Sequence, residues 1–239
     1  MIIPKNIQNI VILTGAGISA ESGIKTFRDQ NGLWEEHDIM EVASPQGFER
    51  DPDIVYRFYN QRRRQLLSDE VSPNSAHIAL KELERKFKGK VNIITQNVDD
   101  LHERCGSKNV IHMHGELLKM RCVKSKKVFL IKNDFNIKTT CPCCLENANL
   151  RPHIVWFGEM PFLMGKIEQL LNECDLFISV GTSGNVYPAA SFVNIATSSS
   201  KCLAIEVNKD GTEVSHNFDI HMTGQASVEI PKLVQSILN

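Results

Sequence analysis

Small residues follow the first apolar run of the chain. The run covers residues 10–13, and residues 15–23 read Gly-Ala-Gly-Ile-Ser-Ala-Glu-Ser-Gly. Gly15, Gly17 and Ala20 have the spacing G-x-G-x-x-G/A, which lets a backbone approach a pyrophosphate and points a helix N-terminus at it. Tight packing of a strand against a helix is the alternative, because the motif alone is weak. We expect a dinucleotide site here.

The residues after these glycines do not fit an ordinary hydride-transfer enzyme. Such an enzyme places an acidic residue about 20 positions farther on, at the end of a second strand, where it holds a ribose. Glu35 and Glu36 have this separation, but no apolar run precedes them. We therefore expect a dinucleotide without a standard dehydrogenase reaction.

Polar side chains also follow the apolar run at 91–94. Gln96, Asn97 and Asp99 offer amide and carboxylate groups that can bind a nicotinamide amide and ribose hydroxyls. Capping of a helix by Asp99 or Asp100 is the alternative. These residues are a second candidate for the cofactor site.

Residues 110–116 predict a short strand with two histidines on one face. His112 and His114 stand at alternate positions of this segment. A histidine at a strand end can act as a general base, because its usual pKa lies near neutrality. A purely structural, hydrogen-bonded histidine is the alternative.

The seven cysteines indicate a metal site rather than disulfides. Their number is odd, and three of them fall within residues 141–144. Such a cluster is more typical of metal binding than of a disulfide framework. Cys105, Cys174 and Cys202 lie in or beside apolar segments, so we expect buried thiols there.

Apolar runs alternate with segments of helical period. The runs are rich in Val, Ile and Leu and are typical of strands buried on both faces of a parallel sheet: 10–13, 91–94, 176–180 and 203–207. Residues 75–88 and 166–174 have the apolar spacing of helices. This order predicts an α/β fold with an open, doubly wound parallel sheet, in which ligands bind beyond the carboxyl ends of the strands.

Two segments depart from the alternation. Residues 36–73 contain a predicted helix at 53–67 but no buried strand, and residues 117–152 carry the cysteine cluster and a lysine-rich stretch. We expect both insertions to form a smaller lobe.

The overall composition excludes several classes of protein. Of 239 residues, 27 are basic and 28 are acidic, for a formal net charge of -1. A general nucleic-acid binder or a binder of anionic membranes needs a basic surface, which this balance does not indicate. The first apolar run has four residues, too few for a signal peptide or a membrane span. We expect a cytoplasmic protein with no membrane contact and no direct nucleic-acid contact.

Together the motifs resemble those of the sirtuin family, in the family's order over residues 10–226. The matching blocks are Gly15-Ala16-Gly17-Ile18-Ser19, Phe27-Arg28-Asp29, Thr95-Gln96-Asn97-Val98-Asp99, His114-Gly115, Phe157-Gly158-Glu159, Gly181-Thr182-Ser183 and Val207-Asn208. The resemblance implies one catalytic domain over residues 1–239, which we expect to be monomeric. Its Rossmann-like large lobe would take about 1–35, 74–116 and 153–239, and its small lobe a helical insertion at about 36–73 and a zinc module at about 117–152.

Sirtuins are NAD-dependent protein deacylases, so the resemblance implies that NAD+ is consumed. Nicotinamide leaves, the acyl oxygen of a modified lysine attacks the ribose carbon, and the products are free lysine and O-acyl-ADP-ribose. The implied catalytic residues are His114, as the base that deprotonates a ribose hydroxyl, with Gln96 and Asn97. The implied cofactor-binding residues are Gly15, Ala16, Gly17, Ala20, Thr26, Phe27, Arg28, Trp34, Gln96, Asn97, Asp99, Gly181, Thr182, Ser183, Asn208 and Ala226.

By the same resemblance, the partners are proteins that carry acylated lysines. Their peptides would insert as an added strand between residues 157–159 and 185–187, a tolerant mode of recognition. The implied substrate-binding residues are Tyr59, Arg62, Val155, Phe157, Gly158, Glu159 and Val186.

Tyr59 and Arg62 resemble the Tyr-x-x-Arg of class III sirtuins, the bacterial desuccinylase and demalonylase branch. Three residues apart, they lie on one face of a helix. They could bind the carboxylate of a succinyl or malonyl group, and we expect acetyl-lysine to be accepted as well. The alternative is that the three successive arginines at 62–64 form a solvated helix face.

The cysteines depart from the family's two C-x₂-C pairs. Cys122, Cys141 and Cys144 stand at matching positions, but Ser125 replaces the fourth cysteine. Cys143 could substitute for it, so we expect a structural Zn²⁺ whose fourth ligand and occupancy stay open.

Two other functions stay open at this point. A mono-ADP-ribosyltransferase could use the same NAD site with another nucleophile. A non-catalytic NAD-sensing or zinc-ribbon module would need neither His114-Gly115 nor Phe157-Gly158-Glu159, so their presence disfavours it.

Overall fold

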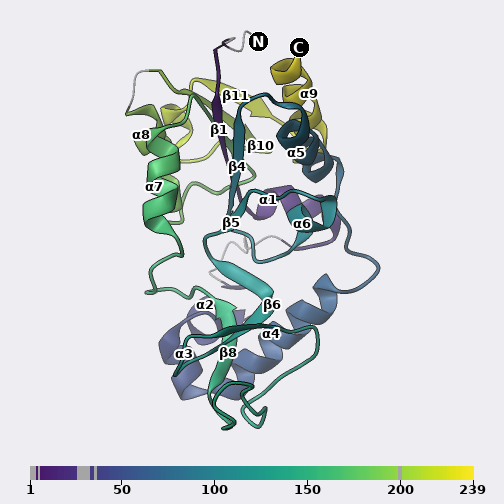
Figure 1. The fold of residues 1–239 in the computed structure, drawn as a ribbon, viewed down its shortest axis with the longest axis vertical. Helices are drawn as coiled ribbons and strands as arrows, with labels where there is room; N and C mark the ends of the chain where they lie inside the picture. Colours follow the sequence, from purple (N-terminus) through teal and green to yellow (C-terminus); the bar gives the residue numbers. More distant parts are fainter. Residues whose placement is uncertain (1–3, 5, 26–32, 35–36, 199–200) are drawn as a thin grey trace.

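A six-stranded parallel sheet forms the centre of the larger lobe (Figure 1). The computed structural model describes residue 4 and residues 6–25, 33–34, 37–198 and 201–239. The strands are β1 (Asn9–Thr14), β4 (Lys90–Thr95), β5 (Val110–His112), β9 (Leu176–Val180), β10 (Leu203–Asn208) and β11 (Ile220–Thr223). Their spatial order is β11-β10-β9-β1-β4-β5. The predicted open parallel sheet is confirmed.

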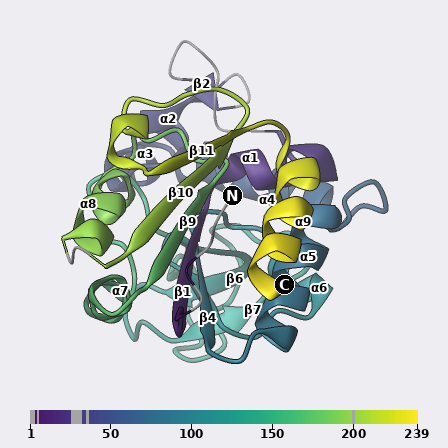
Figure 2. The same ribbon diagram turned by 90° about the horizontal axis from the view of Figure 1, so that it is seen from above.

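Helices cover both faces of this sheet (Figure 2). They are α5 (Ser75–Lys86) and α9 (Ala226–Leu238) on one face and α7 (Met164–Asn172) and α8 (Phe192–Thr197) on the other. Ile10 and Ile12 of β1 pack into the layer of α5 and α9, whereas Val11 and Leu13 pack into the layer of α7 and α8. Since both faces bury apolar side chains, the strand shows no polar alternation.

The strand order reverses beside β1. β4 and β5 follow β1 on one side, while β9, β10 and β11 lie on the other. Thr14 pairs with both Thr95 and Val180, so β1, β4 and β9 end at the same edge of the sheet. Ligands of open α/β sheets bind at such a reversal, beyond the carboxyl ends of the strands.

The smaller lobe lies beyond this edge (Figure 1). It contains α2 (Ile39–Val42), α3 (Pro45–Arg50), α4 (Pro52–Leu66) and the antiparallel sheet of β6 (Gly115–Cys122), β7 (Val128–Leu130) and β8 (Leu150–Ile154). The helix predicted at 53–67 is α4. It begins where the Asp51 side chain accepts the Ile54 N–H at 3.0 Å, with Pro52 at its first position.

The remaining elements of the described residues are short. They are α1 (Ala16–Ser19), α6 (Leu101–Cys105), the pair β2 (Leu33–Trp34) and β3 (His37–Asp38), and the 3₁₀ turns Ala20–Ser22, Ala189–Ser191 and Ser215–Asn217.

The strand predicted at 110–116 is wrong in its extent. β5 ends at His112, Met113 and His114 form a turn, and β6 begins at Gly115 in the other sheet. Gly115 has a φ of 86°, and a Cβ there would lie 2.0 Å from the His153 carbonyl oxygen. Only glycine fits this turn, which divides the apparent strand between the lobes.

Membrane insertion finds no support in the helices. Within the described ranges, none of them combines the length and apolar character that a bilayer crossing requires.

Leu80 tests the predicted core on α5. Its side chain is fully buried, whereas Ile78 on the same helix is 53% exposed. We expect Leu80→Ala to lower the free energy of unfolding by about 2–5 kcal/mol, because a cavity stays behind. Ile78→Ala, the matched control, should change it by roughly 0.5 kcal/mol or less. Urea titration measures both, and equal losses would contradict this account of the core.

Candidate active site

A cavity of about 610 Å³ lies at the carboxyl edge of the parallel sheet, between the lobes. This is an ordinary size for a cofactor or ligand site. Its walls include these predicted residues: Gly15, Ala16, Gly17, Ala20, Tyr59, Arg62, Gln96, Asn97, Asp99, His114, Val155, Phe157, Gly158, Glu159, Gly181, Thr182, Ser183, Val186, Asn208 and Ala226. Thr26, Phe27 and Arg28 lie outside the described residues, as does the side chain of Trp34.

Two glycines bring the loops after β1 and β9 into backbone contact. The Gly17 N–H donates to the Gly181 carbonyl at 2.9 Å. A Cβ on Gly17 would lie 2.6 Å from the Gly181 Cα, and one on Gly15 would lie 2.8 Å from the Gly181 oxygen. The following helix α1 has only four residues, so close packing is what these glycines visibly provide. Both glycines also line the cavity.

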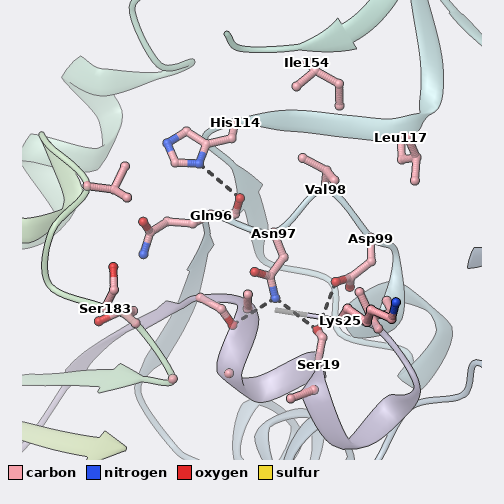
Figure 3. Close-up of a pocket in the computed structure, with 18 of the residues that line it drawn as sticks. Ser19, Lys25, Gln96, Asn97, Val98, Asp99, His114, Leu117, Ile154 and Ser183 are labelled. Atoms are coloured by element: carbon pink, nitrogen blue, oxygen red, sulfur yellow. Dashed lines mark hydrogen bonds between the residues drawn. The ribbon is translucent and has the colours of Figure 1, made fainter. Parts of the chain in front are cut away.

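Ser19 connects the two polar residues of the second loop (Figure 3). Asn97 donates its amide protons to the Ser19 hydroxyl at 3.0 Å and to the Gly15 carbonyl at 3.1 Å. The Ser19 hydroxyl in turn donates to Asp99 at 2.9 Å. Asn97 and Asp99 are thereby oriented at the cavity, where they can bind ribose or amide groups.

Asp99 also contacts the start of α6, although the N-cap residue of this helix is Asp100. The second carboxylate oxygen of Asp99 accepts the Leu101 N–H at 3.1 Å. Burial raises the pKa of Asp99, although this N–H and the Ser19 hydroxyl lower it. One carboxylate therefore contacts both the start of a helix and the cavity wall.

His114 is oriented by the loop after β4. Its Nδ1 lies 3.1 Å from the Gln96 carbonyl oxygen, as Figure 3 shows. Because a carbonyl only accepts, Nδ1 carries the proton and Nε2 is the atom that can take one up. Burial lowers the pKa of His114, while the Gln96 hydrogen bond raises it. The net lowering favours the neutral imidazole that a general base requires.

His112 has a different position from His114. Its Nε2 lies 2.8 Å from the Glu103 carboxylate and its Nδ1 lies 3.3 Å from the Asn97 carbonyl oxygen. Burial lowers the pKa of His112, but the Glu103 and Glu116 carboxylates and the Asn97 carbonyl together outweigh it, so the pKa is raised. His112 is therefore a structural histidine behind the cavity, as the alternative interpretation of this segment had it.

The far side of the cavity is formed by the ends of β9 and β10 and the start of α9. The Asn208 side-chain amide donates to the Thr182 backbone carbonyl at 2.8 Å. The Asn208 backbone carbonyl accepts the Gly224 N–H at 2.9 Å. Ser183, Asn208 and Ala226 all line this side of the cavity, and their assignment to the adenosine half of the cofactor stays a prediction.

The segment after β8 forms the wall on the side of the small lobe. The Val155 N–H donates to the His114 carbonyl and the Phe157 N–H to the Ala43 carbonyl, each at 2.9 Å. Phe157 is 41% exposed and Tyr187 of the facing segment is 73% exposed. The Glu159 carboxylate is bound within the protein: it accepts hydrogen bonds from Arg151 at 2.7 Å and from Arg121 at 3.2 Å.

The three successive arginines of α4 lie in three different environments. Arg62 lines the cavity. Arg63 is fully buried and donates to the Leu117 carbonyl at 3.0 Å. Arg64 lies at the surface, 2.9 Å from Asp134. A uniform solvated face is therefore ruled out for this run.

Four cysteines gather in the small lobe away from the cavity. The sulfur atoms of Cys122, Cys141, Cys143 and Cys144 all lie within 4.8 Å of one another. Tetrahedral Zn²⁺ with bonds of about 2.3 Å spaces its sulfur ligands by about 3.8 Å, so the group fits this ion. The Ser125 hydroxyl lies 3.1 Å from the Cys143 sulfur. Cys143 thus reaches the place left by the missing cysteine.

Three residues have contacts at these sites that the sequence patterns do not indicate. They are Ser19, Cys143 and Trp156. Trp156 donates its indole N–H to the Tyr59 oxygen at 3.0 Å. No periodicity marks such contacts, because each joins segments far apart in the sequence.

Comparison with protein families matches residues 15–188 to the Sir2 family. The chain belongs to the Sir2 family. A relative in Vibrio cholerae serotype O1, named NAD-dependent protein deacylase, is 56% identical over 231 residues, 97% of this chain and 94% of the relative.

Solved structures of Sir2 proteins share the fold of this Sir2-family chain. A Sir2 homologue in complex with NAD has a TM-score of 0.87 and 40% identity, covering 97% of this chain and 90% of that one. A Sir2 protein with a p53 peptide and NAD+ has a TM-score of 0.80 and 30% identity, covering 96% and 93%.

Removing one thiol tests the metal site. We expect Cys143→Ser to lose most of the bound Zn²⁺, about one ion per chain in the unaltered protein, and to melt at a lower temperature. Ser125→Ala should retain the metal. Zinc released after dialysis against a chelator is measured beside a melting curve.

Cys105→Ser is the matched control, since Cys105 lies outside the cluster. Zinc loss in Ser125→Ala with full retention in Cys143→Ser would contradict the four-thiolate assignment.

Proposed function

We propose that this Sir2-family enzyme removes acyl groups from protein lysines in an NAD-dependent reaction. The observation that carries the proposal is the position of His114. The His114 Nδ1 is hydrogen-bonded to the Gln96 carbonyl oxygen. The His114 side chain lines the same cavity as the loop at 15–17 and the segment at 155–159. The names of the relatives and the NAD and peptide complexes support the same activity.

The described residues fit NAD+. Gly15, Ala16 and Gly17 line the cavity, so their backbone could approach the diphosphate. Ser183 and Asn208 offer hydroxyl and amide groups on the adenosine side, and Asn97 and Asp99 offer them on the nicotinamide side. When bound, NAD+ supplies the ribose carbon from which nicotinamide departs. The His114 Nε2 would accept a proton from a ribose hydroxyl. General base catalysis of this kind typically accelerates a reaction by about 10²–10⁴-fold.

The acyl-lysine would enter from the small-lobe side. The exposed Phe157 and Tyr187 lie on the two facing segments and offer apolar contact to a peptide. Main-chain bonds to an added strand would make recognition tolerant of sequence. Tyr59 and Arg62 line the same cavity and would bind the carboxylate of a succinyl or malonyl group.

One assay tests the reaction and the acyl preference. Peptides of one sequence carry acetyl- or succinyl-lysine and are incubated with and without NAD+, with free-lysine peptide measured by mass spectrometry. We expect NAD-dependent release of both acyl groups, and none with His114→Ala. Tyr59→Phe and Arg62→Met should each lower kcat/KM for the succinyl peptide by roughly 10- to 100-fold, because a charge-assisted hydrogen bond is lost.

Deacetylation serves as the internal control and should change much less in the Tyr59 and Arg62 variants. Equal losses on both peptides would argue against carboxylate recognition. Transfer of ADP-ribose to an acceptor protein without lysine release would instead favour the ADP-ribosyltransferase.

The pH profile tests the state of His114. A general base must be neutral, and burial lowers the pKa of His114 below its usual 6.5. Protonation therefore occurs only at lower pH, so kcat/KM should hold through neutrality and fall below a midpoint under 6.5. An acid limb centred well above this value would show that His114 is not the base.

A further inference from the structure

The Tyr59 hydroxyl contacts Trp156, the residue before the segment Phe157-Gly158-Glu159. Trp156 Nε1 and the Tyr59 oxygen are 3.0 Å apart, and both side chains are buried. An indole N–H can only donate, so the phenol oxygen accepts in this bond. The phenol's own proton therefore points away from Trp156, and Tyr59 lines the cavity beside Arg62.

Trp156 is itself held in one position. The Arg151 guanidinium carbon lies 3.3 Å from the centre of its ring, and the Trp156 backbone N–H donates to Glu159 at 2.8 Å. Arg151 donates to Glu159 at 2.7 and 2.9 Å and to the Ile154 carbonyl at 3.0 Å. Phe48 packs against the indole with 5.2 Å between ring centres. These contacts leave the indole little rotational freedom.

The charges around this cluster suit an anionic ligand. Arg121 and Arg151 both pair with the carboxylate of Glu159. Burial raises the pKa of Tyr59 well above its usual range, so the phenol keeps its proton at all physiological pH values. A neutral hydroxyl in a positive surrounding is a good donor to a carboxylate.

We propose that Trp156 is a positioning residue for acyl selectivity: by donating to the Tyr59 oxygen, it directs the phenol proton toward the carboxylate of an acidic acyl group. This inference rests on the proposed deacylase function and deepens it. The ligand class is a lysine acyl chain that ends in a carboxylate. Arg151 and Glu159 act one step farther back, by holding the indole.

The test compares Trp156→Phe, Tyr59→Phe and the double variant on acetyl and succinyl peptides. Trp156→Phe keeps an aromatic ring against Arg151 but removes the N–H. We expect its kcat/KM for the succinyl peptide to fall by roughly 3- to 10-fold, mostly through a higher KM, with deacetylation nearly unchanged. In the Tyr59→Phe background the same substitution should have no further effect on selectivity, since the two groups act through one bond.

Phe48→Leu is the matched control. It loosens the packing against the same indole without removing the hydrogen bond, so it should affect both peptides alike. If Trp156→Phe also lowers both activities equally, the inference is overturned and the deacylase function stands.

Assays of the unaltered enzyme on the two peptides distinguish failure of this inference from failure of the proposed function. Release of acetyl but not succinyl groups would overturn this inference and the acidic-acyl preference, yet leave the deacylase. Release of neither would overturn the proposed function itself.

A second measurement uses the wild-type protein and therefore does not depend on whether Trp156→Phe folds. In isotope-labelled wild-type protein without NAD+, the Trp156 indole N–H resonance, assigned with the help of Trp34→Phe, should shift more with succinyl than with acetyl peptide. Equal shifts would count against the inference.

Discussion

The backbone contact between Gly17 and Gly181 is the constraint on which the cavity depends. It joins the loops after β1 and β9, which are neighbours in the sheet but far apart in the sequence. With no side chain between them, the loop after β1 lies close enough for Ser19 to reach Asn97 and Asp99. A larger residue at either glycine would move the polar groups that face the cofactor.

The small lobe combines apolar packing with buried polar groups. Val55, Phe58 and Trp156 belong to one apolar cluster, and a second cluster includes Cys122 and Cys141. The buried Arg63 donates to the Leu117 carbonyl within this lobe. Tyr59 belongs to the first of these clusters and also lines the cavity, so the packing of this lobe shapes the cavity wall.

Local patterns predicted the larger elements well. The four apolar runs all became parallel strands, and the helix expected at 53–67 is α4, at Pro52–Leu66. The strand at 110–116 was wrong because alternation continued through a turn that depends on contact between Gly115 and His153. Helix α9 was not predicted at all, and it contains Pro231, which weakens the usual helical signal.

The sequence by itself determined which residue types follow each strand, and therefore which groups meet at the carboxyl edge of the sheet. Strand burial and helical period are local properties, so they can be recognised without the fold. The tertiary structure alone decided the partners: Ser19 between Asn97 and Asp99, the Cys143 sulfur among the other three, and the Trp156 N–H on Tyr59. Such bonds require particular distances and directions between segments far apart in the chain, and residue spacing carries no information about them.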